Sequence, residues 1–154
     1  MSLEDDIRII ASVPLFEDLS TEQLRLLAFG AERITLARGR ELYRESQNAE
    51  CGYVVVSGEI DLFRDTLRGR EIIKRVGPGT LLGELALITE TARLSGAFAP
   101  EEAQVMRINR SLFRRMLEEY PETAAALHAR LTEQLQDFLE EIATLDGRFD
   151  GADI

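Results

Sequence analysis

Between residues 31 and 108, short apolar runs alternate with turn signals, and this stretch limits the possible folds more than any other. Ile34 and Leu36 fall on one side of a first run. A β-branched run at 53–56 is followed by Ser57-Gly58, a typical hairpin turn. The remaining runs lie at 71–76, 94–98 and 103–108. Short strands at such regular intervals predict a sandwich or a small barrel, not alternating strands and helices.

Helical patterns flank the strands on both sides. An early helix around Asp5–Ala11 should stop before Pro14, and Ser20 with Gln23 has the spacing of a capping box. After residue 109, which has a capping side chain, Tyr120-Pro121 predicts a break between two helices. The apolar pattern of the second helix runs to about residue 145.

Charge and composition exclude several classes of function. The net charge is −10, whereas a protein that binds duplex DNA needs a basic face, so direct nucleic-acid binding is not expected. One cysteine and one histidine are too few for an internal disulfide or a histidine-rich metal site. No apolar run approaches about 20 residues, and the N-terminus is acidic where a signal peptide would be basic. We therefore expect a cytoplasmic protein without a membrane span.

The stretch GELALITETARLSG, residues 83–96, breaks the strand rhythm and carries the chemistry. A single helical turn after Gly83 would present backbone N–H groups to an anion. Arg93 would add a fixed positive charge and a planar set of donors suited to a phosphate. Glu84 is an acceptor and needs a donor such as a ribose hydroxyl. Phosphate and sugar hydroxyl together indicate a nucleotide.

This stretch resembles the phosphate-binding cassette of the cyclic-nucleotide-binding domain superfamily, which includes the catabolite activator protein and protein kinase A regulatory subunits. The matching residues are Leu82 to Leu87 and Ala92 to Ser95, and Pro14-Leu15-Phe16 and Gly77-Pro78-Gly79 also fall where the family has them. The resemblance implies an eight-stranded, jelly-roll-like barrel (a double-stranded β-helix), mainly β with flanking helices. It places N-terminal helices at 1–30, the barrel at 31–108, the cassette at 82–95, C-terminal helices at 109–145 and an acidic tail at 146–154, in one domain of 154 residues.

The resemblance also implies roles for individual residues. Glu84 would accept a hydrogen bond from the ribose 2′-hydroxyl, and Arg93 would meet the charged oxygen of the cyclic phosphate. The backbone amides that would complete the phosphate shell belong to Gly83, Leu85, Leu94 and Ser95. No catalytic residue, metal or other cofactor is implied, and an enzyme is the least supported class because no nucleophile, base and orienting group can be proposed together.

The chain departs from the family pattern at three places. Ala92 replaces a proline, Leu94 replaces a small residue, and the base-contacting stretch of the long helix carries Phe138 and Leu139. The side chains of Phe138 and Leu139 can cover a base but cannot hydrogen-bond to it. Since Leu94 is not the threonine that accompanies guanine preference, cyclic AMP is favoured over cyclic GMP as the ligand.

The final helix carries an apolar stripe at heptad-like spacing, which suits either packing on its own barrel or a seam between two copies. We expect a homodimer through residues 124–145, and the stripe consists of Ala124, His128, Leu131, Leu135, Phe138, Ile142 and Leu145. Because no helix-turn-helix follows before Ile154, we expect a stand-alone sensor that signals through its last helix and dimer rearrangement to an unknown protein partner. Two alternatives remain: a ligand-free dimerisation or interaction module, and the sensor part of a transcriptional regulator.

Overall fold

Antiparallel strands fill the middle of the chain, as the alternating pattern predicts. The computed structural model describes residues 3–152, without the side chains at 124, 128, 131, 134 and 144–152. The strands within this range are β1 (Glu32–Leu36), β2 (Glu41–Tyr43), β3 (Asn48–Ala49), β4 (Cys51–Ser57), β5 (Ile60–Thr66), β6 (Gly69–Val76), β7 (Leu81–Leu82), β8 (Thr91–Ala92), β9 (Gly96–Phe98) and β10 (Ala103–Asn109). The prediction of a mainly antiparallel β fold with flanking helices is confirmed.

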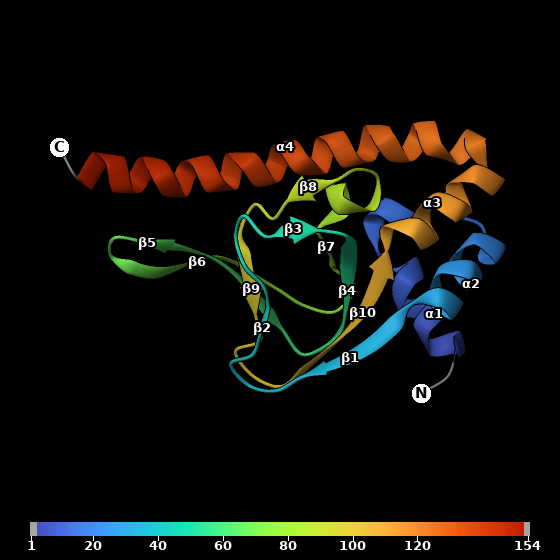
Figure 1. The fold of residues 1–154 in the computed structure, drawn as a ribbon, viewed down its shortest axis with the longest axis horizontal. Helices are drawn as coiled ribbons and strands as arrows, with labels where there is room; N and C mark the ends of the chain where they lie inside the picture. The colour runs from blue at the N-terminus through green and yellow to red at the C-terminus, as the bar shows by residue number, and fades with distance from the viewer. Residues whose placement is uncertain (1–2, 153–154) are drawn as a thin grey trace.

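Eight of these strands form two four-stranded sheets, and the short strands β3 and β8 form a separate pair. The first sheet has the order β1-β10-β4-β7 and the second β2-β9-β5-β6. The apolar side chains of both sheets meet in one core, which includes Tyr53 and Val55 from β4 and Leu62 from β5. Figure 1 shows the long β5–β6 hairpin extending from the rest of the sheets.

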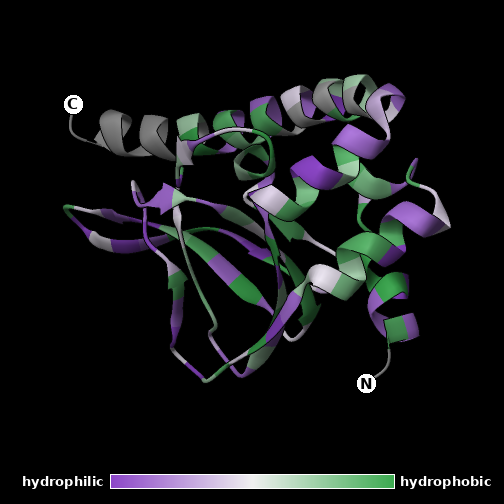
Figure 2. Ribbon diagram, turned by 45° about the vertical axis from the view of Figure 1, so that its right-hand side comes forward, coloured by the Kyte–Doolittle hydropathy of each residue, from purple (hydrophilic) through white to green (hydrophobic). Residues whose placement is uncertain are grey.

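Strand β4 is covered on both faces, which explains its continuous apolar run. Tyr53 and Val55 point into the core between the sheets, whereas Val54 and Val56 point outward into a second core beneath the helices. Successive side chains of a strand alternate between its two faces, so a strand covered on both faces needs apolar residues at every position. In Figure 2, by contrast, hydrophobic and hydrophilic residues are interspersed along other strands of the sheets.

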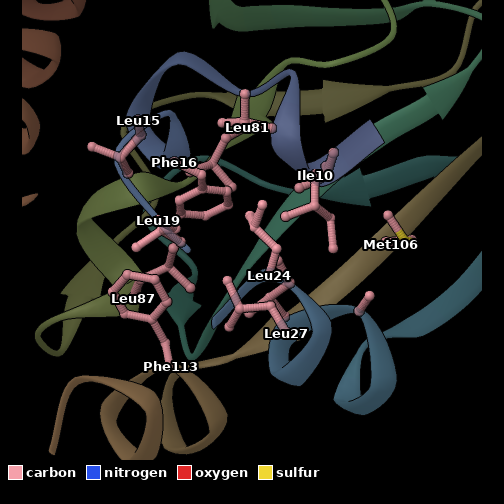
Figure 3. Close-up of a cluster of buried hydrophobic side chains, with 14 of the residues drawn as sticks. Ile10, Leu15, Phe16, Leu19, Leu24, Leu27, Leu81, Leu87, Met106 and Phe113 are labelled. Carbon is pink, nitrogen blue, oxygen red and sulfur yellow. The ribbon is translucent and has the colours of Figure 1, made fainter. Parts of the chain in front are cut away.

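The helices are α1 (Leu3–Ala11), α2 (Thr21–Gly30), α3 (Arg110–Glu119) and α4 (Pro121–Ala152), with short 3₁₀ turns η1 (Pro14–Phe16) and η2 (Glu84–Leu87). Helices α1, α2 and α3 pack on the outer face of the first sheet, whereas α4 contacts η1, η2 and β6. Phe16 of η1 and Phe113 of α3 lie 5.9 Å apart between ring centroids, and both are fully buried. Leu87 of η2 joins this cluster, as Figure 3 shows. The turn that carries Glu84 is thus packed on the helical core.

The helix boundaries follow the sequence signals with two corrections. The capping box at Ser20 and Gln23 is present, and α3 ends before Pro121. Asn109 occupies the N-cap position of α3 but makes no capping hydrogen bond with its side chain, since its Oδ1 accepts from Arg107 Nε at 3.1 Å instead.

The second correction concerns the end of the last helix. We expected a helix to about Leu145 and an acidic tail at 146–154, but α4 continues to Ala152. Gly147 and Gly151 lie within it. A glycine in a helix costs about 1 kcal/mol but keeps its backbone N–H, so without a proline the helix can continue.

Side-chain hydrogen bonds hold helix α4 to the rest of the chain at two points along its length. Arg130 donates to Glu17 and Asp18, each at 2.8 Å, and to the Pro14 carbonyl at 3.1 Å. Further along, Glu141 accepts a hydrogen bond from Lys74 of β6 at 3.2 Å. Figure 1 shows the helix lying across the side of the molecule that carries β3, β8 and η2. The helix therefore covers the stretch 83–95.

Candidate functional site

A cavity of about 560 Å³ lies between η2, the segment after β8, and helix α4. This volume falls within the usual range of about 300–1,000 Å³ for small-molecule sites. The six candidate residues from the cassette all line it: Gly83, Glu84, Leu85, Arg93, Leu94 and Ser95. Phe138 of α4 also lines it, whereas Leu139 is 46% exposed and is not part of the lining. Of the two base-covering candidates, the structure brings only Phe138 to the cavity.

Arg93 is the most unusual residue of the cavity. Its side chain is 93% buried, since only 7% is exposed, and its Nη2 donates to the Cys51 carbonyl at 2.9 Å. Its Nε and Nη1 are buried and have no hydrogen-bond partner within the described part of the chain. An unpartnered buried donor costs about 1–3 kcal/mol, and more when charged. A group held in this way is suited to receive an anion.

Two tyrosines hold the Arg93 guanidinium group in place. Its Cζ lies 4.2 Å from the ring centroid of Tyr43 and 5.5 Å from that of Tyr53, and the two rings are stacked on each other. A cation over an aromatic face gains about 0.5–2 kcal/mol, depending on its desolvation. Burial raises the pKa of the Tyr43 hydroxyl well above its ordinary value. Tyr43 therefore stays neutral and supports the cation through its ring.

Gly83 gives the guanidinium group its space. Its φ of +77° is in the left-handed region, and a Cβ atom there would lie 2.1 Å from Arg93 Nη1. Any other residue would meet both backbone strain and a steric clash. Gly83 therefore precedes the turn that would present N–H groups to an anion, as the sequence predicts, and it also accommodates the arginine.

Glu84 begins η2 and faces the same cavity. Burial raises the pKa of its carboxyl group, while its own backbone N–H and the charge of Lys74 act in the opposite direction. Ion pairs within 4.0 Å occur elsewhere in the described part of the chain, but none of them joins Glu84 to Arg93. Their spacing alone would suit a structural ion pair equally well, but the geometry does not support such a pair.

Three charged residues of the cavity were missed by the sequence analysis. Lys74 of β6 and Asp137 and Glu141 of α4 all line it. Glu141 Oε2 is buried and has no hydrogen-bond partner among the described residues. Glu141 lies three positions after Phe138, and side chains at this spacing share one face of a helix. That spacing was the signal that would have identified it.

The described residues 3–152 contain no cluster of three or more His, Cys, Asp or Glu side chains that could hold a metal ion. In the same range, every helix is too short or too polar to cross a membrane.

Comparison with known proteins identifies the family. Residues 33–120 match the model of the cyclic nucleotide-binding domain. The Cyclic AMP receptor protein of Thermus thermophilus is 30% identical over 125 residues, which cover 80% of this chain and 58% of that protein. The chain belongs to the cyclic nucleotide-binding domain family, whose model describes a binding domain and not a catalytic one.

Solved structures give the same assignment. A cyclic nucleotide-binding-like protein from Brucella abortus is 59% identical with a TM-score of 0.69, covering 74% of this chain and 98% of that one. The regulatory domain of Toxoplasma gondii PKA, crystallised with cAMP, is 26% identical with a TM-score of 0.69, covering 74% of this chain and 44% of that one. The chain spans a little over half of the Thermus protein, so it corresponds to part of that relative.

The raised pKa of Glu84 predicts a pH-dependent stability effect in the free protein. A carboxyl group whose folded-state pKa is raised favours folding when protonated and opposes it when ionised. Glu84→Gln should therefore stabilise the unliganded protein at pH 7, and the gain should shrink as the pH falls toward the ordinary value of 4.5. Thermal unfolding at pH 4 and pH 7 measures the difference. The exposed Glu90→Gln is the matched control, and a Glu84→Gln protein that is less stable at pH 7 would contradict this account.

Proposed function

We propose that this cavity binds a cyclic mononucleotide, with cyclic AMP as the ligand, and that the chain acts as a sensor or regulatory domain. The observation that carries the proposal is Arg93, a buried guanidinium group with two unpartnered nitrogens, beside a carboxylate that has no cationic partner within 4.0 Å among the described ion pairs. A cyclic phosphate carries one negative charge, which one arginine can neutralise, and it leaves the ribose 2′-hydroxyl free to donate.

The proposed roles follow the lining of the cavity. Arg93 Nε and Nη1 bind a phosphate oxygen, and Glu84 accepts from the ribose hydroxyl. Backbone amides complete the phosphate shell, from Gly83, Leu85, Leu94 and Ser95. Because η2 has only four residues, its dipole is small, and the arginine provides most of the attraction for the anion.

Helix α4 supplies the proposed contacts to the base. Phe138 covers the ring, while the buried, unpartnered Glu141 Oε2 can accept a hydrogen bond. The exocyclic amino group of adenine is a donor that suits this oxygen. Guanine carries donors of its own at N1 and N2, so this contact suits either base, and the preference for cyclic AMP rests on Leu94, where threonine would favour guanine. The cAMP in the crystal structure of the regulatory domain of Toxoplasma gondii PKA gives further support.

The same relatives define the alternatives. As a stand-alone sensor the chain would signal through α4 to a protein partner, and as part of a regulator it would correspond to the 58% of the Thermus receptor that it spans. A ligand-free module of the same fold would keep Arg93 on Cys51 and Tyr43 without ever needing an anion. The unpartnered nitrogens favour the sensor.

Replacement of Arg93 tests the proposal directly. Arg93→Leu should weaken cyclic AMP binding by about 2–5 kcal/mol, because the phosphate charge would be buried without a partner. Isothermal titration calorimetry measures this loss. The free variant should remain folded, since the guanidinium group leaves two buried nitrogens unsatisfied in the free protein.

Arg70→Leu is the control for this experiment, because Arg70 stacks on Phe63 at 3.8 Å and is not part of the cavity. It should bind like the wild type. Wild-type protein that shows no thermal shift with millimolar cyclic AMP or cyclic GMP would favour the ligand-free module. Unchanged affinity in Arg93→Leu would reject the assigned role of the arginine.

We further propose that the chain forms a homodimer through α4, within residues 124–145. Leu135 and Phe138 of the apolar stripe line the chain's own cavity, so dimerisation would link the ligand site to the second copy. Ala124, His128, Leu131 and Leu145 lie outside the described side chains. Sedimentation equilibrium should give twice the 17.3 kDa of one chain, and Leu139→Lys, at an exposed apolar position of α4, should weaken the association. A monomer at high micromolar concentration would contradict the dimer.

A further inference from the structure

Arg110 connects the two halves of the cavity wall without lining the cavity itself. It is the first residue of α3, and its Nε donates to the Ala86 carbonyl at 2.8 Å. Its Nη2 donates to the Ala49 carbonyl, and its backbone N–H donates to the Glu50 carbonyl at 3.0 Å. Ala49 and Ala86 both line the cavity, and both are almost fully buried. One guanidinium group thus bridges two wall segments.

One of these segments carries Glu84. Ala86 lies two positions after Glu84 within the single turn η2, so holding the Ala86 carbonyl fixes the orientation of that turn. At its two ends the turn is held by backbone hydrogen bonds from Ala86 N to the Gly83 carbonyl, and from Ile88 N and Thr89 N to the Leu85 carbonyl. The Arg110 guanidinium group adds a restraint from outside the turn.

The other segment holds the backbone of Arg93. Ala49 of β3 pairs with Thr91 of β8, just before Arg93. The chain leading into β3 exchanges two hydrogen bonds with Arg93 itself: Arg93 N donates to the Gln47 carbonyl, and Ser46 N donates to the Arg93 carbonyl, both at 2.8 Å. Fixing Ala49 therefore fixes the position from which the Arg93 side chain starts.

We propose that Arg110 is a positioning residue of the site: its guanidinium group sets the distance between the Arg93 arm and the Glu84 arm of the cavity. The part of this proposal that concerns ligand affinity rests on the proposed function. A guanidinium group carries donors at separate points of a rigid fork, so Nε and Nη2 of Arg110 reach two different carbonyls, and hydrogen bonds from a charged donor are about twice as strong as neutral ones. Among the described ion pairs, Arg110 has no carboxylate partner, so its charge acts on these carbonyls.

The position of Arg110 also links the site to the last helix. Helix α3 leads through Tyr120 directly into α4, which covers the cavity. A ligand that draws the Arg93 and Glu84 arms together would act on α3 through Arg110. The second contact of this kind, from Arg114 Nη2 to the Ile88 carbonyl, is longer, at 3.3 Å, and exposed.

The test compares Arg110→Met and Arg110→Lys with Arg115→Met, a matched control at an exposed position of the same helix. In the unliganded protein, hydrogen exchange at the amides of residues 46–49 and 84–93 should become at least about tenfold faster in Arg110→Met, the change expected from losing one charged hydrogen bond. Amides of α2 and of the β5–β6 hairpin should keep their wild-type rates. Arg115→Met should leave all of these regions unchanged.

Ligand affinity supplies the second readout. Arg110→Met should bind cyclic AMP at least about tenfold more weakly than wild type, with Arg110→Lys between them because an ammonium group cannot span both carbonyls. Wild-type affinity and wild-type exchange in Arg110→Met would overturn the proposal, as would faster exchange spread evenly over the whole chain. If the wild type binds no cyclic nucleotide, the proposed function fails, while the exchange pattern still decides the role of Arg110.

Discussion

The site depends on the positive charge of Arg93, which the fold buries without giving all of its nitrogens a hydrogen-bond partner. Arg93 is 7% exposed, stacks on Tyr43 and gives one nitrogen to the Cys51 carbonyl, yet two of its nitrogens have no partner in the described chain. Such an arrangement costs free energy in the unliganded state. In the proposed function an anion would supply the missing partners, so the cost of the free site would be converted into affinity. Gly83 permits this arrangement because it has no side chain to occupy the same space.

The rest of the molecule holds the two segments of this site, which carry Glu84 and Arg93, at a fixed separation. The η2 turn with Glu84 packs through Leu87 onto the helical core, and the Arg93 segment is tied to the loop before β3. Arg110 spans the two, and α4 closes the cavity from outside. The elements that recognise the ligand and the helix that would transmit a signal are therefore in direct contact. A change in the separation of the arms can reach α4 without a long chain of intermediates.

Much of this arrangement could be predicted from the sequence, because local rules governed it. The strand rhythm, the capping box at Ser20 and the break at Pro121 depend on neighbouring residues only, and all three are found in the structure. The cassette residues were found because their glycine, glutamate and arginine lie close in sequence. The contact of Arg93 with the rings of Tyr43 and Tyr53 could not be predicted in this way, because the tyrosines lie far from the arginine in the sequence. The last helix was predicted too short because the apolar pattern that indicated it ends at about residue 145, although the glycines beyond this point still support helical hydrogen bonds.

The central claim is that the free nitrogens of Arg93 bind the phosphate of a cyclic nucleotide. Two-dimensional ¹H–¹⁵N NMR of arginine Nε–H groups, recorded during a titration with cyclic AMP, observes this contact directly, with Arg93 assigned from its loss in Arg93→Lys. The account predicts a large downfield shift and slower solvent exchange for the Arg93 Nε–H, with the Arg70 signal unchanged. An Arg93 signal that stays in place while the protein is saturated with ligand would contradict it.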